Sequence, residues 1–331
     1  MLGIDAGATK TAYALYSPQQ DRTWLLYGGC GNHEGMPGGY DEFRTVMDMH
    51  IRKLCDAAGI APQDVSCAGL GIAGVDTKRQ HALISDIFRG IGLARFRLAN
   101  DAVLGIKAEC PTGVCAVNGT GFCVYGIDDQ GSTAQTGGLG HLTGDRGGGS
   151  YYAEQAIQAV YNSLEKHGPD TSMTARVLEL VQAESPELFV ERLSECMEGP
   201  ERERVQRELS VTVHACAQQG DPVALGILTG SGEEYAASIG SVLRRLPRLT
   251  ADGQVDLVLV GSCFLRAGCT RTRDVMEARL CTAFPETRFT IRPIRSEPVV
   301  GALLWAAEEE NGDAIPEARI RTALAHAIRV P

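Results

Sequence analysis

The sequence predicts an α/β protein made of two domains that share one plan. Its 331 residues suit two domains of ordinary size, each with enough chain to bury a core. Early in each half, two apolar strands are joined by a short turn rich in glycine and threonine, at residues 7–11 and 119–121. Strand and helix patterns alternate after both turns, as in α/β domains. We expect a boundary near residues 109–113, which gives domains at 1–110 and 111–331.

The first of these hairpins covers residues 2–16. A short apolar strand reaches Asp5, a glycine follows, and a second apolar strand begins at residue 12. Glycine at such a turn adopts backbone angles that other residues resist, so a tight β-hairpin is expected. Backbone N–H groups there could bind phosphate oxygens, and Asp5 could hold Mg²⁺, usually through a water molecule. The candidate phosphate-binding residues are Gly7, Thr9, Lys10 and Thr11.

The same turn can also be an ordinary polar connection, and the stretch by itself leaves this alternative open. It is not a Walker A loop, because that motif needs glycine at the position of Thr9 and a helix after Thr11. A second hairpin with the same order of strand, turn and strand favours the phosphate interpretation. It covers residues 114–126 and carries Gly119, Thr120 and Gly121 at its turn.

Apolar spacing predicts the other elements of the first half. Residues 24–27 form a third strand, and Phe43, Met47 and Ile51 recur at helical spacing in a helix that Gly59 ends. Three further elements follow, a strand at 65–69, a helix at 77–90 and a strand at 95–99.

The second half repeats strands and then adds helices. It begins with strands at 113–118, 122–127 and 132–136, and a glycine-rich loop at 137–150 leads into a helix at 151–166. Residues 168–219 are expected to be an all-helical insertion. The later elements are a helix at 221–245, a strand at 255–260, a helix at 271–283, a strand at 288–291 and a helix at 298–310. We expect a last helix, at about 316–328, to pack on the first domain.

A competing motif lies at residues 69–74, where G-x-G-x-x-G follows a strand, as in a dinucleotide-binding dehydrogenase. The details oppose this interpretation. Asp76 and Thr77 are the natural helix N-caps, so the helix would begin after the third glycine and would not face a pyrophosphate. The sequence therefore favours a glycine-rich strand end beside a cleft.

Composition narrows the class of protein. The net charge of −10 argues against a nucleic-acid partner, and no run reaches the roughly 18 apolar residues of a membrane helix. No signal peptide is visible, and eleven cysteines occur without a C-x-x-C pair, so a cytoplasmic protein with reduced thiols is expected. Cys110 with Cys115, or Cys263 with Cys269, could alternatively form a redox or metal site.

Asp101 is the candidate for acid–base chemistry. It follows the strand at 95–99, and ligand sites in α/β sheets gather at the carboxyl ends of strands. The alternative is that Asp101 only caps the helix that begins at Ala102.

The paired hairpins resemble those of the superfamily that includes actin, hexokinase and the heat-shock-protein ATPases. The string Gly-Gly-Leu-Gly-His-Leu-Thr-Gly-Asp at 137–145 resembles the N-acetylglucosamine kinase branch, which is grouped with the BadF/BadG/BcrA/BcrD ATPases. The resemblance spans nearly the whole chain. It implies two ribonuclease-H-like (actin/hexokinase-type) domains, with mixed five-stranded sheets flanking a nucleotide cleft and a helical insertion in the second domain.

The resemblance also implies roles for individual residues. Asp101 would be the general base that takes the proton of the sugar hydroxyl, and Asp145 would hydrogen-bond sugar hydroxyls. Asn32 and His33 match an Asn-His pair that contacts the sugar. Gly261 and Ser262 look like the adenosine motif, and residues 298–302 resemble the start of the family's C-terminal helix, beside the nucleotide.

Four positions depart from the family pattern. Phe122 and Cys123 stand where the second phosphate motif often has serine and a polar residue, and Arg146 and Gly148 stand where glutamate and serine are usual. All four lie on the acceptor side, so ATP binding is the better supported part of the prediction.

The sequence therefore predicts an ATP- and Mg²⁺-dependent kinase that phosphorylates an amino sugar, such as N-acetylglucosamine or glucosamine, at a primary hydroxyl. One alternative is a BadF-type ATPase that couples hydrolysis to a protein partner. Another is a non-catalytic sugar sensor, against which Asp5, Lys10 and Asp101 argue. Whether the protein forms a homodimer stays open.

Overall fold

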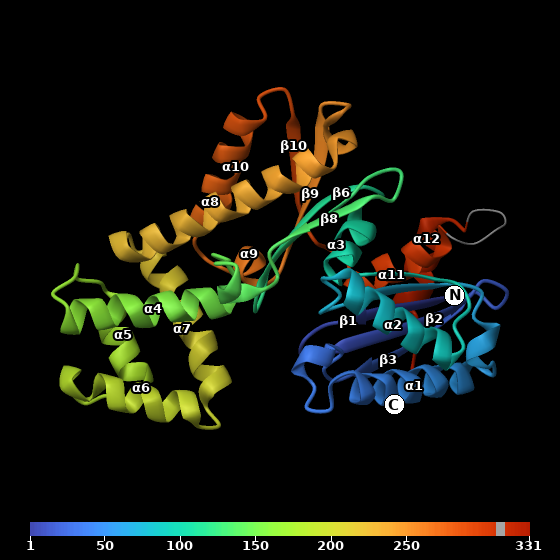
Figure 1. The fold of residues 1–331 in the computed structure, drawn as a ribbon, viewed down its shortest axis with the longest axis horizontal. Helices are drawn as coiled ribbons and strands as arrows, with labels where there is room; N and C mark the ends of the chain where they lie inside the picture. Colours follow the sequence, from blue (N-terminus) through green and yellow to red (C-terminus); the bar gives the residue numbers. More distant parts are fainter. Residues whose placement is uncertain (309–314) are drawn as a thin grey trace. The chain divides into compact units, whose positions relative to one another are not determined.

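The computed structural model describes residues 1–308 and 315–331, which divide into two compact units (Figure 1). Unit 1 consists of Met1–Cys115, Asp129–Gly131 and Ile294–Pro331. Unit 2 consists of Ala116–Asp128 and Ser132–Pro293. Unit 1 therefore contains both ends of the chain.

Unit 1 is built on a six-stranded sheet with the strand order β11-β3-β2-β1-β4-β5. The hairpin predicted at the start is present, because β1 and β2 pair antiparallel, with Ala6 opposite Thr11. β4 and β5 then add in parallel, and β3 pairs antiparallel with β2. The strands are β1 Leu2–Ala6, β2 Thr11–Ser17, β3 Arg22–Gly28, β4 Ala68–Ile72, β5 Phe96–Ala99 and β11 Ile328–Arg329.

The expectation of five strands was wrong for this sheet. The sixth strand, β11, pairs in parallel with β3. It has only two residues, which is too short for an alternating strand pattern to be seen in the sequence. It takes the place of the end of the helix predicted at 316–328. β4 also begins later than the predicted 65–69, because a turn at Pro62–Asp64 precedes it.

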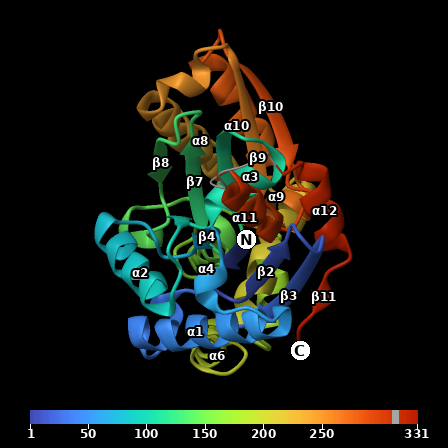
Figure 2. The ribbon, with the colours of Figure 1, turned by 90° about the vertical axis from the view of Figure 1, so that its right-hand side faces the viewer.

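The two faces of this sheet are covered by different helices (Figure 2). α1 and α2 pack on the face that carries Ile4, Tyr13 and Leu26. α11 and α12 pack on the opposite face, which carries Ala12 and Ala14. This alternation follows from the two-residue period of a strand. The helices of unit 1 are α1 Gly39–Ala58, α2 Lys78–Ile91, α3 Ala102–Glu109, α11 Pro298–Ala307 and α12 Glu317–Ala325.

α11 was expected in the second half, and the structure places it in unit 1. Its backbone passes so close to β1 and β4 that a side chain at Gly3 or Gly69 would meet Ala302. The helix is apolar nearly all round, so burial between the sheet and α3 suits it. The last two residues of the predicted helix, 309 and 310, lie outside the described residues.

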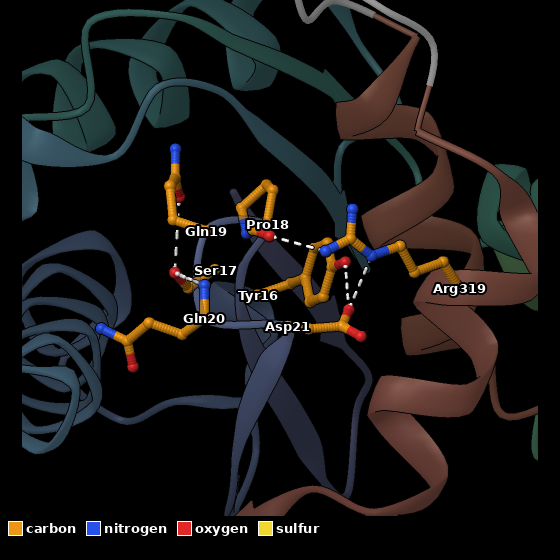
Figure 3. Close-up of polar contacts among 7 residues, drawn as sticks. All are labelled: Tyr16, Ser17, Pro18, Gln19, Gln20, Asp21 and Arg319. Atoms are coloured by element: carbon orange, nitrogen blue, oxygen red, sulfur yellow. Dashed lines mark hydrogen bonds and ion pairs between the residues drawn. The ribbon is translucent and has the colours of Figure 1, made fainter.

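α12 is tied to the turn between β2 and β3 (Figure 3). Arg319 donates to Asp21 Oδ1 at 2.8 Å and to the carbonyl oxygen of Pro18 at 2.8 Å. The hydroxyl of Tyr16 donates to the same Asp21 oxygen at 2.9 Å. This carboxylate therefore joins the final helix to the hairpin of the sheet.

Unit 2 contains a five-stranded sheet with the order β10-β9-β6-β7-β8. Its strands are β6 Gly113–Asn118, β7 Phe122–Ile127, β8 Thr133–Thr136, β9 Gln254–Val260 and β10 Arg288–Pro293. α8 (Pro222–Arg245) packs against β7 and β8, and α10 (Arg271–Ala283) packs along α8. A four-residue helix, α9 (Ser262–Leu265), follows β9.

The predicted helical insertion is a separate bundle with its own core. It contains α5 Met173–Leu180, α6 Phe189–Glu198 and α7 Arg202–Gln218, and these pack with α4 Gly148–Glu165 around Val160, Phe189 and Leu209. α4 begins three residues before the predicted start because the second hairpin receives hydrogen bonds from its first turn.

The G-x-G-x-x-G string of residues 69–74 does not open a helix. α2 begins at Lys78, and its N-cap Thr77 accepts from Gln80 N. Each glycine has a packing reason instead, because a side chain at Gly69, Gly71 or Gly74 would meet Ala302, Leu104 or Asn32. The dehydrogenase alternative is therefore wrong for this stretch.

Replacing Gly69 by alanine should destabilise unit 1. The added methyl would overlap the carbonyl oxygen of Ala302, and such overpacking costs about 1–3 kcal/mol. Gly90, exposed near the end of α2 with no atom near its missing side chain, is the matched control. Gly90→Ala should stabilise by about 0.5–1 kcal/mol, since alanine is the better helix former. Urea unfolding of both variants measures the difference, and equal effects would contradict the close packing of α11.

Candidate functional site

The turn of the first hairpin is an exposed loop held at its base. Gly7 N donates to the carbonyl oxygen of Lys10 at 2.9 Å, and Gly31 N donates to that of Gly7 at 2.9 Å. Thr9 and Lys10 are exposed. Their hydroxyl and ammonium groups are therefore accessible to an anion.

Thr11 has a different role from the expected one. It is fully buried, and its hydroxyl donates to the carbonyl oxygen of Gly29 at 2.9 Å. Gly31 packs against this hydroxyl so closely that a side chain there would overlap it. Thr11 thus joins the hairpin to the loop after β3, and this contact accounts for the residue without a phosphate.

Asp5 lies in a row of residues that crosses three strands. It is opposite Ala12 on β2, and Ala12 is opposite Tyr27 on β3, so the three side chains share the face that α11 covers. Burial raises the pKa of Asp5 to about 6, the Lys10 charge lowers it and the Glu297 charge raises it. Glu297 is the N-cap residue of α11 and accepts from the hydroxyl of Tyr27 at 2.8 Å.

A divalent cation fits this position. Asp5 is a partly buried carboxylate whose charge Lys10 only partly offsets, so a cation beside it would be stabilised. Mg²⁺ usually takes one or two carboxylates and keeps several waters. Among the described residues, no three His, Cys, Asp or Glu side chains form a complete metal cage. Asp5, with Glu297 nearby, therefore suits a hydrated Mg²⁺. Glu297 was not predicted from the sequence, because only the fold brings it to Tyr27 and near Asp5.

Asp101 does not act as the side-chain cap of α3. It occupies the N-cap position without a capping hydrogen bond, and the neighbouring Asn100 accepts from Ala102 N at 3.0 Å instead. Burial raises the pKa of Asp101 to about 7, with further increases from the charges of Asp5 and Asp76. Asp5 is opposite Gly71, and Gly71 is opposite Ala99, the last residue of β5 and two residues before Asp101. The carboxyl group of Asp101 is thus free of the capping role and poised to titrate near neutral pH.

Asp76 is a second acid of this cluster that the sequence analysis weighed only as a helix cap. The buried side chain of Asn100 donates to Asp76 Oδ1 at 2.9 Å while its own oxygen accepts from α3. Asn100 therefore fixes both Asp76 and the start of α3. Asp101 lies between Asn100 and Ala102 in the chain.

The Asn32-His33 pair lies against the same segment. Gly74 has a positive φ of 81°, and a side chain there would meet Asn32 and His33. Asn32 Oδ1 accepts from Glu34 N at 2.9 Å. His33 is buried and stacks on Tyr40 with ring centroids 4.2 Å apart. Burial lowers the pKa of His33, so the imidazole is neutral at pH 7.

His33 also has an atom with no hydrogen-bond partner among the residues that the structure describes, the buried Nδ1. Unpaired buried polar atoms are rare and often mark a binding position. Unit 1 thus gathers Asn32, His33, Asp76, Asn100 and Asp101 around the segment at 74–77.

The second hairpin presents its backbone in a defined direction. The carbonyl oxygens of Gly119 and Thr120 accept from Gly149 N at 2.8 Å and Ser150 N at 3.1 Å, in the first turn of α4. In a trans peptide, the N–H points away from the carbonyl of the same peptide unit. The N–H groups of Thr120 and Gly121 therefore both point away from α4. Two such neighbouring amides form an anion-binding pair.

Gly261 lies against this hairpin, and its position explains the residue. It has a positive φ of 101°, and a side chain would overlap the backbone of Asn118 and Gly119. Ser262 follows at the exposed first position of α9. The structure thus brings the predicted adenosine motif beside the predicted second phosphate motif.

Asp145 organises the glycine-rich loop that carries it. One carboxylate oxygen accepts from Gly138 N and Gly140 N, both at 2.9 Å, and the other accepts from Thr143 Oγ1 at 2.8 Å. Phe122, one of the departures from the family pattern, packs on Tyr235 with centroids 4.5 Å apart and fills the space left by Gly137 and Gly147. The aromatic ring therefore supports the loop from inside unit 2.

Two further findings concern other kinds of site. None of the helices in the described part of the chain has the length and apolar character that crossing a membrane requires. None of the eleven cysteines, all of which lie in the described part of the chain, forms a disulfide, and several, including Cys110 and Cys115, are buried.

Comparisons with known proteins give one coherent result. The model of the BadF/BadG/BcrA/BcrD ATPase family matches residues 2–306. An N-acetylmuramic acid/N-acetylglucosamine kinase of Clostridium acetobutylicum is 25% identical over 249 residues, which cover 74% of this chain and 80% of that protein. An N-acetyl-D-glucosamine kinase of Dictyostelium discoideum is 24% identical over 324 residues, covering 94% and 98%.

Solved structures confirm the fold. A structure described as a putative N-acetylglucosamine kinase of Chromobacterium violaceum matches with a TM-score of 0.65 and 20% identity, over 92% of this chain and 98% of that one. A ROK family glucokinase of Streptomyces griseus matches with a TM-score of 0.54 and 15% identity, over 92% and 97%. The predicted pair of actin/hexokinase-type α/β domains and the predicted family resemblance are therefore correct.

The new role of Thr11 can be tested by stability. Thr11→Val removes the hydroxyl and leaves the Gly29 carbonyl unpaired, which should cost about 1–3 kcal/mol. Thr23, on the adjacent strand β3, is the matched control, since its buried hydroxyl has no partner among the described residues. Thr23→Val should be neutral or stabilising. Urea unfolding compares the variants, and an unchanged stability with strongly weakened ATP binding in Thr11→Val would restore the phosphate role.

Proposed function

Since the chain belongs to the BadF/BadG/BcrA/BcrD ATPase family, we propose that it is an ATP-dependent sugar kinase. The acceptor is an amino sugar, with N-acetylglucosamine first among the candidates, and the primary hydroxyl receives the phosphoryl group. The named activities of the Clostridium and Dictyostelium relatives support this acceptor class.

The observation that carries the proposal is the state of Asp101. It is a partly buried carboxyl group that takes no part in capping α3, and its pKa is raised to about 7. A general base works best when its pKa lies near the operating pH. Polar side chains with donors and acceptors surround it, which suits a polyhydroxylated acceptor better than an apolar one.

The sugar is held by hydrogen-bond donors and by hydrogen-bond acceptors. In unit 1, the side-chain nitrogen of Asn32 donates to a sugar hydroxyl, and the unpaired Nδ1 of buried His33 bonds the sugar. In unit 2, the carboxylate of Asp145 accepts from sugar hydroxyls. The Asp145 carboxylate accepts three hydrogen bonds within its loop and still has lone pairs that can accept further ones.

Each unit carries one hairpin to which we assign phosphate binding. Thr9 and Lys10 of the first hairpin bind phosphate oxygens, while Gly7 closes the turn through its bond to Lys10 and Thr11 supports the turn through its bond to Gly29. The outward N–H groups of Thr120 and Gly121, next to Gly119, bind phosphate in unit 2. Gly261 and Ser262 leave room for the nucleoside, since neither carries a large side chain.

Asp5 would hold Mg²⁺ through water, and Glu297 would add a second negative charge near it. When bound, the ion would neutralise charge on the transferred phosphoryl group and on the leaving diphosphate. Each acid is positioned by the protein alone, Asp5 by strand β1 and Glu297 by its bond from Tyr27.

Phosphoryl transfer then depends on the positions of Asp101, the sugar hydroxyl and the γ-phosphate. Asp101 accepts the proton of the primary hydroxyl as that oxygen forms a bond to the γ-phosphorus. The bond between the γ-phosphorus and the bridging oxygen breaks, and ADP leaves with the electron pair. A positioned base contributes about 10²–10⁴-fold, while orientation and charge neutralisation supply most of the rest.

A panel of sugars tests this function. The purified protein with ATP and Mg²⁺ should form ADP and a sugar 6-phosphate with N-acetylglucosamine or another amino sugar, detected by coupled assay and mass spectrometry. Asp101→Ala should lower the turnover number about 10²–10⁴-fold, because the proton acceptor is lost. ATP affinity by calorimetry should stay within a fewfold. ATP hydrolysis that no sugar accelerates would instead indicate an ATPase that works with a protein partner.

The acid limb of the pH profile should depend on Asp76. Asp101 must be deprotonated to act as base, so kcat/KM for the sugar should rise through about pH 7. Asp76→Asn removes one negative charge that raises the pKa of Asp101, so the limb should move to lower pH. Glu34→Gln, at the edge of the same cluster, is the control and should leave the limb in place. Identical profiles in wild type and Asp76→Asn would remove Asp76 from this role.

A further inference from the structure

We infer that Asn118 is a positioning residue of the second phosphate-binding hairpin. The inference rests on the proposed function, because it assigns this residue to the binding of ATP phosphates. Asn118 is the last residue of β6, directly before the turn, and its side chain is fully buried. It therefore cannot be explained as a solvent-facing turn residue.

The side-chain amide of Asn118 uses both of its ends. Its oxygen accepts from Gly148 N at 2.8 Å, and its nitrogen donates to the hydroxyl of Tyr152 at 3.1 Å. That hydroxyl also lies 2.8 Å from Ser231 Oγ, on α8. Asn118 thus ties the end of β6 to α4 and, through one tyrosine, to α8.

These contacts continue a regular pattern. Asn118, Gly119 and Thr120 accept hydrogen bonds from Gly148, Gly149 and Ser150, in that order. The first member of the series is a side chain and the other two are backbone carbonyls. Three consecutive donors at the start of α4 therefore fix three consecutive residues of the hairpin. This fixes the direction of the Thr120 and Gly121 N–H groups, which point away from α4.

The chemistry of the position selects an amide. Only a side chain with an acceptor and a donor can satisfy Gly148 N and the Tyr152 hydroxyl at once. Leucine has a similar size and offers neither, and Gly148 N would then be buried without a partner. The hairpin would keep its fold but lose the first of its three attachments. The orientation of its amides would become less defined.

The experiment compares two variants that act on this chain of contacts. Asn118→Leu removes both bonds, and Tyr152→Phe removes only the hydroxyl that receives the Asn118 amide. Binding of MgATP is measured by calorimetry, and backbone exchange at residues 118–121 and 148–150 is measured by hydrogen–deuterium exchange. We expect ATP affinity to fall at least tenfold in Asn118→Leu and about threefold in Tyr152→Phe. Exchange in both segments should rise.

Thr171→Val is the matched control in the same unit. Its buried hydroxyl donates to Asp221 Oδ2 at 3.0 Å, in the helical bundle. This variant should lose stability while ATP affinity stays within twofold of wild type. The KM for the sugar should also stay within twofold in Tyr152→Phe, because the contact lies on the nucleotide side.

Wild-type ATP affinity in folded Asn118→Leu would overturn the inference. If that variant does not fold, unchanged affinity and exchange in Tyr152→Phe overturn it. A tenfold weakening in Thr171→Val would show a general effect of stability and would also overturn it. Failure of the wild-type protein to bind MgATP is a different result, since it removes the proposed function itself.

Discussion

The candidate site of unit 1 depends on partly buried carboxyl groups that are costly to ionise. Burial raises the pKa of Asp5 and of Asp101, the Glu297 charge adds to the increase at Asp5, and the Asp5 and Asp76 charges add to it at Asp101. Keeping such groups together costs folding free energy, and a structure keeps them where a cation or a proton transfer uses them. Asn100 fixes Asp76 through a hydrogen bond, and the charge of the exposed Lys10 offsets only part of the increase in the pKa of Asp5.

Much of the fold could be predicted because it follows local patterns. The period of Phe43, Met47 and Ile51 gave α1, and Gly59 adopts the left-handed conformation that ends it. The sheet positions of β11 and α11 could not be predicted, since they depend on contacts between residues about 300 positions apart. A strand of two residues is too short to show a period, and the sequence of a helix that is apolar on all sides does not indicate which sheet it covers.

The residues of the candidate site likewise fall into those that local sequence predicts and those that only the fold reveals. Sequence alone indicated Asp5, Lys10 and Asp101, because each stands at a turn or strand end where ligands bind. It assigned Thr11 to phosphate, since a hydroxyl beside a lysine looks available until burial is known. Glu297 and Asn118 were missed for the opposite reason. Their partners, Tyr27 and Gly148, are distant in sequence, so no spacing marks them.

The discontinuous make-up of unit 1 has a consequence for synthesis on the ribosome. The face of its sheet that carries Ala12 and Ala14 emerges early, whereas α11, which covers it, is made only after the whole of unit 2. Unit 2 can assemble its sheet and bundle while that apolar face still lacks its helix. During this interval the nascent chain exposes an apolar surface that is prone to aggregation and to which a chaperone would bind.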